Sequence, residues 1–156
     1  MAREVSAGVL VHRPGPDGPE FLLVHPGGPY WAKKDEAAWS IPKGLVDPGE
    51  ETWVAAAREF EEELGQPVTG EPQPLEPCLT PGGKLIVAWL VAADLDLSSL
   101  RSNTFEMEWP RGSGRLRVFP EVDRAAYFPS ELALKKIHRG QRPLVHQALK
   151  RLAHLG

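Results

Sequence analysis

A cluster of glutamates, Glu59, Glu62 and Glu63, is the feature of this sequence best suited to chemistry. On a helix, their i, i+3 and i+4 spacing makes the carboxylates neighbours, and each like-charged pair costs about 0.2–0.5 kcal/mol. A divalent cation would turn that repulsion into binding. Mg²⁺ fits best, because it takes oxygen ligands and is commonly shared between carboxylates and substrate phosphates. The alternative is a solvated acidic face, in which Arg58 neutralises Glu62 without any metal.

These carboxylates need a helix to position them, and the sequence predicts one over residues 51–64. Gly65 stands where a C′ glycine belongs, and Pro67 prevents the helix from continuing. At helical periodicity, a narrow apolar stripe should pack against a sheet. The stripe comprises Trp53, Ala57, Phe60 and Leu64.

A glycine-bounded loop, residues 44–50, leads directly into this helix. The unpaired N–H groups and the positive dipole end of a helix N-terminus favour anions, although Glu50 and Glu51 can already fill that role. Glu50 can also fold back onto Arg58 and tie the loop to the helix. Loop, ion pair and carboxylates would then act as one unit.

The segment from Gly44 to Gln66 resembles the Nudix box, GX₅EX₇REUXEEXGU, where U is a bulky aliphatic residue. The odds of a chance match are on the order of 10⁻⁸ per starting position. The fixed positions match at Gly44, Glu50, Arg58, Glu59, Glu62, Glu63 and Gly65. Gln66 departs from the final U, which affects packing at the helix exit rather than the chemistry.

The resemblance implies an α/β fold, the Nudix α/β/α sandwich with a mixed β-sheet between helices, formed by residues 1–156 as a single domain. It also implies Mg²⁺-dependent hydrolysis of a diphosphate linkage in a nucleoside diphosphate derivative, with Mn²⁺ as an alternative cation. The implied metal ligands are Glu59, Glu62, Glu63 and the backbone carbonyl of Lys43. Glu50 and Arg58 would form the supporting ion pair.

Substrate choice depends on residues outside the box. The segment of residues 40–44 is similar to that of dinucleoside polyphosphate and diphosphoinositol polyphosphate hydrolases, and the Lys43 ammonium can lie over additional phosphates. Lys33 and Lys34 are further candidates for phosphate contact. We therefore expect a dinucleoside polyphosphate substrate. The alternatives are a nucleotide sugar, ADP-ribose or a nucleoside triphosphate, or a non-catalytic Nudix-fold module that binds a nucleotide.

A fourth carboxylate ligand or a general base is expected from outside the box. The first candidates are Glu106 and Glu108, on the polar side of a predicted strand over residues 104–109, ahead of Glu121 and Asp123. Several aromatic side chains could stack on a base, but we favour core or rim packing for each. These are Tyr30, Trp31, Trp39 and Trp109.

Strands that precede and follow the central helix in the sequence predict a mixed α/β domain. The expected strands are residues 5–12, 21–25, 39–41, 75–79, 84–92, 104–109, 115–119 and 125–128. Two final helices are expected over residues 130–138, with Ser130 as N-cap, and 143–155. Residues 26–38 and 42–48 are predicted to be loops.

The length of 156 residues and the hydrophobic fraction of 42% allow one domain with a sizeable core. Cys78 is the single cysteine, so neither an internal disulfide nor a cysteine zinc site is expected. The formal net charge of −3 gives no field to attract nucleic acid, and no apolar run approaches the roughly 18 residues of a membrane span. We expect a cytoplasmic protein acting on a small-molecule nucleotide or polyphosphate.

Overall fold

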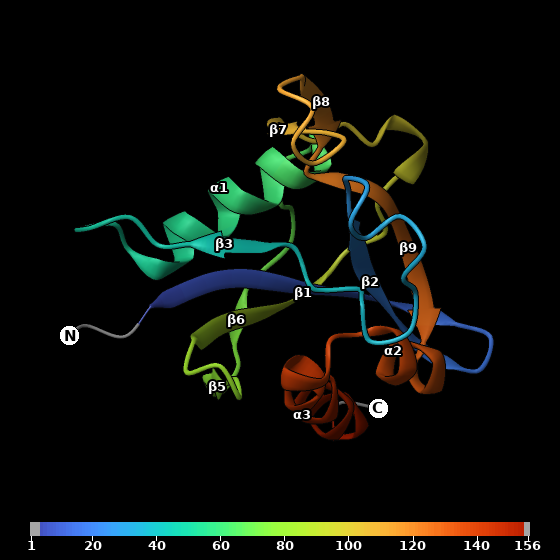
Figure 1. Cartoon of the computed structure of the whole chain (residues 1–156). Helices are drawn as coiled ribbons and strands as arrows, with labels where there is room; N and C mark the ends of the chain where they lie inside the picture. Colours follow the sequence, from blue (N-terminus) through green and yellow to red (C-terminus); the bar gives the residue numbers. More distant parts are fainter. Residues whose placement is uncertain (1–3, 155–156) are drawn as a thin grey trace.

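The computed structural model describes residues 4–154, in which a mixed β-sheet lies between α1 on one face and α2 and α3 on the other (Figure 1). The strands are β1 (Val5–Gly15), β2 (Gly18–Pro26), β3 (Lys43–Leu45), β4 (Gln73–Pro74), β5 (Cys78–Leu79), β6 (Leu85–Ala92), β7 (Thr104–Glu108), β8 (Leu116–Pro120) and β9 (Val122–Pro129). The α-helices are α1 (Thr52–Leu64), α2 (Ser130–Lys136) and α3 (Arg142–Ala153), and short 3₁₀ turns occur at Leu97–Ser99 and Arg139–Gln141. The expected α/β/α sandwich is confirmed.

The main sheet has the strand order β4-β6-β1-β2-β9, with β3 also pairing to β1 and β5 to β6. β1 runs parallel to β6 and antiparallel to β2 and β3, so the sheet is mixed as expected. β9 runs antiparallel to β2, so a late strand of the chain pairs with an early one. β7 and β8 form a separate antiparallel hairpin, which projects beyond the end of α1 in Figure 1.

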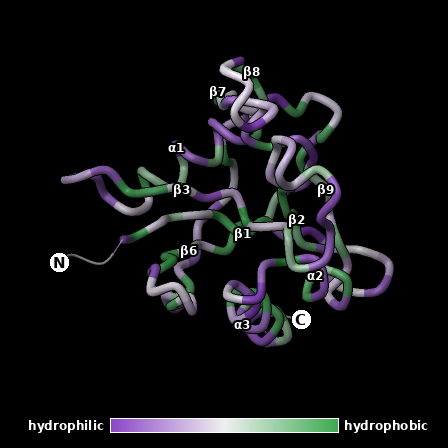
Figure 2. The backbone as a smooth tube through the Cα atoms, viewed as in Figure 1, coloured by the Kyte–Doolittle hydropathy of each residue, from purple (hydrophilic) through white to green (hydrophobic). Residues whose placement is uncertain are grey.

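Successive side chains of the central strands point to opposite faces of the sheet, and they form two hydrophobic cores, one on each face. Figure 2 shows the apolar stretches that run through β1 and β2. Val9 of β1 packs toward α1, whereas its neighbour Leu10 belongs to the core under α2 and α3. The sheet is thus covered on both sides, and α1 is fixed by burial rather than by helix propensity.

The buried face of α1 differs from the predicted stripe. Phe60 and Leu64 are fully buried as expected, but the other buried residues are Ala55 and Ala56. Trp53 remains at the margin, where its ring lies edge-on to Trp89 with 5.3 Å between centroids. Small alanines at the centre let the helix lie close to the sheet, which moves the contact line away from the bulky Trp53.

The predicted end of α1 is confirmed. Gly65 adopts the left-handed conformation at φ 75°, and its N–H donates to the carbonyl of Glu61 over 2.8 Å. A side chain there would also collide with the carbonyl of Arg101, since an added Cβ would lie 2.5 Å from it. Gln66, the departure from the motif, donates to the carbonyl of Asp96 and to Ser99, so it ties the helix exit to the distant 3₁₀ turn at Leu97–Ser99.

Several local predictions were wrong. Part of the 42–48 loop is strand β3, because Gly8 on β1 leaves room for Lys43 and for the Pro42 carbonyl opposite. Residues 39–41 make only isolated bridges, and the single strand expected over 75–79 is replaced by the short strands β4 and β5. Ser130 is the first helical residue rather than the cap, and its hydroxyl donates to the carbonyl of Pro19. Leu155, the expected end of the last helix, lies outside the described residues.

No helix within residues 4–154 combines the length and the apolar character that a membrane span requires.

Candidate active site

The loop that precedes α1 is tied to the helix by a bidentate ion pair. The Nε and Nη2 of Arg58 lie 3.0 Å from the two carboxylate oxygens of Glu50. Glu50 also accepts the N–H of Asp47 over 3.0 Å, and these contacts hold the pKa of its carboxyl below the usual range. The pairing expected from the sequence is present, and it gives the loop one fixed shape.

Arg58 is shared among several carboxylates. Its Nη1 donates to Glu59 over 2.9 Å and to Glu62 over 3.3 Å, while Nη2 also donates to the carbonyl of Leu45. The alternative in which Arg58 partly neutralises the acidic face is therefore realised for two of the three glutamates. The pKa of Arg58 is raised, chiefly by the Glu50 hydrogen bonds.

Gly44 at the start of the motif makes room for Glu59. A Cβ added to Gly44 would lie 2.0 Å from the carboxyl carbon of Glu59, so a side chain there would displace the Glu59 carboxylate. The Glu59 side chain is only 14% exposed, and burial raises the pKa of its carboxyl. β3 and α1 therefore meet at a glycine–carboxylate contact.

Glu63 is the most enclosed carboxylate of the group. Its Oε1 accepts the backbone N–H of Lys43 over 3.3 Å. Burial raises the pKa of Glu63 to about 8, with a further rise from the charge of Glu59, while the Lys43 ammonium opposes the shift. Burial likewise lowers the pKa of Lys43. A half-buried carboxylate and a half-buried ammonium thus line the same cavity at the junction of β3 and α1.

Glu121 is the carboxylate from outside the box that joins this group. It immediately precedes β9, and its carbonyl accepts the N–H of Gly27 over 2.9 Å. Its own burial raises the pKa of Glu121, and the charge of Glu62 raises it further. Sequence reasoning ranked Glu121 below two other glutamates, because its position depends on the distant pairing of β9 with β2.

The favoured alternatives, Glu106 and Glu108, are not brought to the site. Side chains alternate along β7, so Phe105 and Met107 face the cavity next to Glu121 while the two glutamates lie exposed on the opposite side. Glu108 instead accepts the N–H of Gly112 in the hairpin turn. The alternation of side chains along β7 was predicted correctly. The side of the hairpin that faces the site was predicted wrongly.

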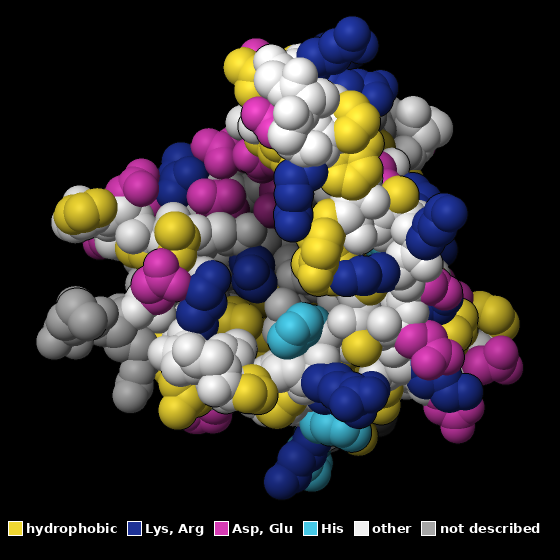
Figure 3. Space-filling model, viewed as in Figure 1, with side chains coloured by type: hydrophobic (Ala, Val, Ile, Leu, Met, Phe, Trp, Pro, Cys, Tyr) yellow, Lys and Arg dark blue, Asp and Glu magenta, His cyan; other side chains and the backbone are white. Residues whose placement is uncertain are grey.

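Two adjoining cavities run across these residues, and we call them together the cleft. One, of about 410 Å³, is lined by Tyr30, Trp31, Phe105 and Met107 as well as by Glu63 and Glu121. The other, of about 160 Å³, contains Lys43 and shares Pro26, Glu63 and Glu121 with the first. Figure 3 shows the hollow beneath the β7–β8 hairpin, with acidic side chains on the α1 side and hydrophobic ones on the other.

The lysines expected to contact phosphate differ in position. Lys43 lines the cleft beside the carboxylates. The Lys34 ammonium lies 3.7 Å from the ring centroid of Tyr30 and 4.9 Å from that of Trp31, at the aromatic end. Lys33 is exposed and lines neither cavity of the cleft, so the structure does not bring it to the site. Trp31 lies at the rim of a core, as expected for the aromatic residues.

Within residues 4–154, no three acidic, histidine or cysteine side chains converge as a ready metal site. Arg58 holds Glu59 and Glu62, while Glu63 faces Lys43. The group nevertheless fits a hard divalent cation. Its donors are carboxylate oxygens, and burial raises the pKa of Glu63, which disfavours a charged form that a bound cation would stabilise.

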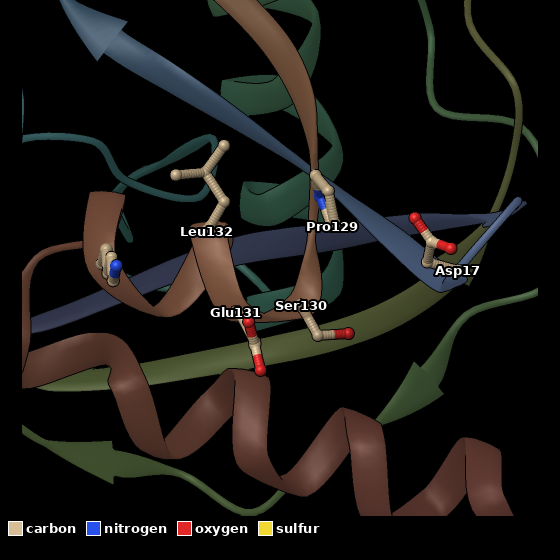
Figure 4. A pocket seen from close by; sticks show the side chains of 6 residues that line it. Asp17, Pro129, Ser130, Glu131 and Leu132 are labelled. Carbon is tan, nitrogen blue, oxygen red and sulfur yellow. The ribbon is translucent and has the colours of Figure 1, made fainter.

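A larger cavity of about 550 Å³ lies elsewhere, between the β1–β2 turn and the start of α2 (Figure 4). Asp17, Pro129, Ser130, Glu131 and Leu132 contribute to its walls. It shares no residue with the cleft, and none of the motif residues reaches it. Volume alone therefore does not locate the chemistry.

The NUDIX domain family model matches residues 2–148. A segment of 58 residues is 41% identical to the asymmetrical bis(5'-nucleosyl)-tetraphosphatase of Caenorhabditis elegans, covering 37% of this chain and 38% of that protein. Another of 29 residues is 59% identical to an RNA pyrophosphohydrolase of Nitrobacter winogradskyi, covering 19% of this chain and 17% of that protein. The chain thus aligns with well under half of the length of these relatives.

Solved structures share the fold over nearly the whole chain. A C. elegans Ap4A hydrolase in a binary complex superposes with a TM-score of 0.63 at 24% identity, covering 97% of this chain and 98% of that one. The NUDIX domain of Shewanella oneidensis NrtR, complexed with ADP ribose, gives a TM-score of 0.68 at 14% identity, covering 97% and 90%. At these identities the likeness establishes the fold.

Proposed function

Because the chain belongs to the NUDIX domain family, we propose that it is a pyrophosphohydrolase that cleaves a diphosphate linkage in a nucleoside diphosphate derivative. The observation that carries the proposal is the cleft. Lys43, Glu63 of the Nudix box and Glu121 line one of its cavities together, and the adjoining cavity is lined by aromatic rings. Cations and carboxylates so arranged can hold a diphosphate and activate a water molecule.

The proposed ligands of a divalent cation are the box carboxylates Glu59, Glu62 and Glu63, together with the backbone carbonyl of Lys43. Glu121 is proposed as the additional carboxylate in place of Glu106 or Glu108, since it lines the cleft with Glu63. Mg²⁺ is the expected ion and Mn²⁺ the alternative. When bound, such an ion would neutralise phosphate oxygens and lower the pKa of a coordinated water.

The chain's own residues have separate roles in the reaction. The Lys43 ammonium holds a phosphate oxygen, and the Glu50–Arg58 pair keeps the loop of residues 44–50 against α1. A water oxygen forms a bond to phosphorus as the bridging P–O bond breaks and its electron pair leaves with the departing phosphate. A carboxylate of the cluster takes the proton from the attacking water.

The aromatic end of the cleft supports a nucleotide as the substrate class. Tyr30, Trp31 and Phe105 offer ring faces on which a base can stack, and the Lys34 ammonium lies above two of those rings. A dinucleoside polyphosphate suits both lysines, because Lys43 lines one cavity of the cleft and Lys34 lies over the rings of Tyr30 and Trp31, which line the other. The partial matches to a dinucleoside tetraphosphatase and to an RNA pyrophosphohydrolase agree with a phosphate chain of this kind.

A nucleotide panel tests the proposal. Dinucleoside polyphosphates, ADP-ribose, nucleotide sugars and nucleoside triphosphates are incubated with Mg²⁺ or Mn²⁺, and the products are identified in ¹⁸O-labelled water. We expect turnover that depends on the cation, with label on the phosphorus that was attacked. The variant Glu63→Gln serves as the control that lacks the ionisable carboxylate.

Absence of turnover on every member of the panel would refute hydrolysis. Nucleotide binding without turnover would identify a non-catalytic Nudix-fold module instead. Turnover that remains undiminished in Glu63→Gln would refute the site while leaving the reaction class intact.

We also propose that residues 1–156 act as one domain. Both hydrophobic cores are built on the same sheet, and the family match extends from β1 into α3.

A further inference from the structure

The aromatic wall of the cleft is formed in part by a loop without regular secondary structure. We call residues 27–38 the aromatic loop, because they carry Tyr30 and Trp31, and they contain neither strand nor helix. A loop of this kind places its side chains only as well as its anchors allow. The contacts that fix it therefore decide how well the wall is formed.

The two ends of the aromatic loop are held by hydrogen bonds, and near the second end the Asp35 carboxylate accepts from Nε1 of Trp39 and from Lys136. The N–H of Gly27 donates to Glu121, and the N–H of Ala37 donates to Lys135, each over 2.9 Å. In the described part of the chain, one hydrogen bond links residues 28–34 to the rest of the protein. It runs from Nε2 of His25 to the carbonyl of Lys34 over 2.6 Å.

His25 is completely buried, and both nitrogens of its ring face oxygen acceptors. Nδ1 lies 2.8 Å from a carboxylate oxygen of Asp123, and Nε2 meets the Lys34 carbonyl. The ring also lies against the edge of Trp39, with 5.2 Å between centroids. Contacts at both ring nitrogens give the imidazole a single orientation, so the Lys34 carbonyl is held at a fixed point.

The carboxylate partner links this anchor to the reactive end of the cleft. Asp123 follows Glu121 on the segment that starts β9, and the pairing of β2 with β9 shifts register between His25 and Pro26. His25 thus connects the strand that carries Glu121 to the loop that carries the aromatic wall. None of the box glutamates is a hydrogen-bonding partner of His25.

We propose that His25, oriented by Asp123, is a positioning residue that fixes the aromatic loop through Lys34 and thereby sets the affinity of the cleft for the aromatic part of a substrate. The proposal rests on the proposed function for its kinetic consequence. Because the anchor acts on the wall and not on α1, its loss should raise KM for a nucleotide substrate and leave kcat nearly unchanged.

Two variants separate the two hydrogen bonds of the ring. In His25→Asn, the side-chain amide reaches the place of Nδ1, so the bond to Asp123 is kept and the bond to Lys34 is lost. In His25→Gln, the amide nitrogen reaches the place of Nε2, so the bond to Lys34 is kept. Both remove the buried ring, which makes each the control for the other. Tyr127→Phe, which removes a hydroxyl bonded to Ala93 and Leu95, controls for the loss of a polar contact elsewhere on β9.

We expect His25→Asn to raise KM for the best nucleotide substrate by about tenfold, as the loss of one buried hydrogen bond implies. His25→Gln and Tyr127→Phe should keep KM within about threefold of the parent protein, and kcat should remain within about twofold in all three. Hydrogen exchange of the Lys34 amide, which donates to Trp31 in the free protein, should accelerate in His25→Asn and not in His25→Gln.

Equal KM values and equal exchange rates in the Asn and Gln variants would overturn the proposal, as would a fall in kcat with an unchanged KM. Exchange is measured on the protein without substrate or added metal. If the parent protein hydrolyses no diphosphate, the proposed function fails, while the exchange comparison still decides whether His25 anchors the loop.

Discussion

The cleft has two walls that are built in different ways. On one, α1 and β3 hold carboxylates through a bidentate ion pair, a glycine that admits a carboxylate, and burial against the sheet. On the other, rings are presented by the aromatic loop, which has no regular secondary structure, and by the two-stranded β7–β8 hairpin. The rigid wall of α1 and β3 is suited to a reaction that is the same for many substrates. The wall of the aromatic loop and the hairpin is suited to selecting among those substrates.

The reactive wall should account for the largest effects. Glu62→Gln or Glu63→Gln should lower kcat/KM by about two orders of magnitude or more, because each removes a negative charge from the proposed cation site. Steady-state kinetics with Mg²⁺ measures this, and circular dichroism checks that the fold survives. Glu106→Gln, on the exposed side of β7, is the matched control and should leave activity unchanged. A comparable loss in that variant would reverse the assignment of Glu121 over Glu106.

The support of that wall should matter somewhat less. Arg58→Lys keeps the charge but cannot form the bidentate contact with Glu50, so activity should fall by about 10-fold to 100-fold. Arg13→Lys is the control, because Arg13 pairs with Glu20 and Asp94 away from the cleft. Titration of activity against Mg²⁺ should show a weaker apparent affinity only in the Arg58 variant. Identical titrations would mean that the pair does not position the glutamates.

Changes in the second wall should affect substrate choice. Trp31→Ala or Phe105→Ala should raise KM for nucleotide substrates by about tenfold, the scale of one base–aromatic stacking contact, while kcat changes little. Trp109→Ala, at the end of the same hairpin and outside the cleft, is the comparison. A fall in kcat as large as that caused by the glutamate variants would erase the distinction between the two walls.

The smallest expected effect is a change in stability with pH. Burial raises the pKa of Glu63 from the ordinary 4.5 to about 8, so the folded protein keeps a proton that the unfolded chain releases. Its contribution to stability is complete below pH 4.5 and disappears as the pH rises to about 8. Thermal unfolding in the presence of a chelator should therefore give a Tm that declines more steeply across this range for the parent than for Glu63→Gln. Parallel curves would contradict the burial assigned to this carboxylate.

The reactive wall was largely predictable from the sequence because its parts are close together in the chain. Glu50 and Arg58 meet through the start of a single helix, and the positions of Gly44 and Gly65 follow from helix geometry and a motif. The face of α1 that packs on the sheet was predicted less well. The rotation of a helix about its axis depends on the surface against which it packs, and α1 buries Ala55 and Ala56.

The parts that were missed depend on distant pairing. Strand β3 exists because residues 43–45 align with β1, and its short sequence has no strand pattern of its own. Glu121 reaches the cleft through the register of β9 on β2, and Glu106 is excluded because of how the hairpin docks. His25 resembled an ordinary strand residue, since its function depends on the carbonyl of Lys34 and on Asp123, a carboxylate far along the chain.

The pairing of β9 with β2 has a consequence for how this protein is made. A ribosome finishes the entire glutamate motif long before it reaches Glu121, yet the sheet beneath α1 lacks β6 and β9 until those residues emerge. Non-local pairing of this kind forms late. We therefore expect that α1 packs against the complete sheet only after β6 and β9 have been synthesised. A chain cut short before residue 121 would carry every residue of the recognisable motif and still possess neither the outer carboxylate nor the anchor of the aromatic loop.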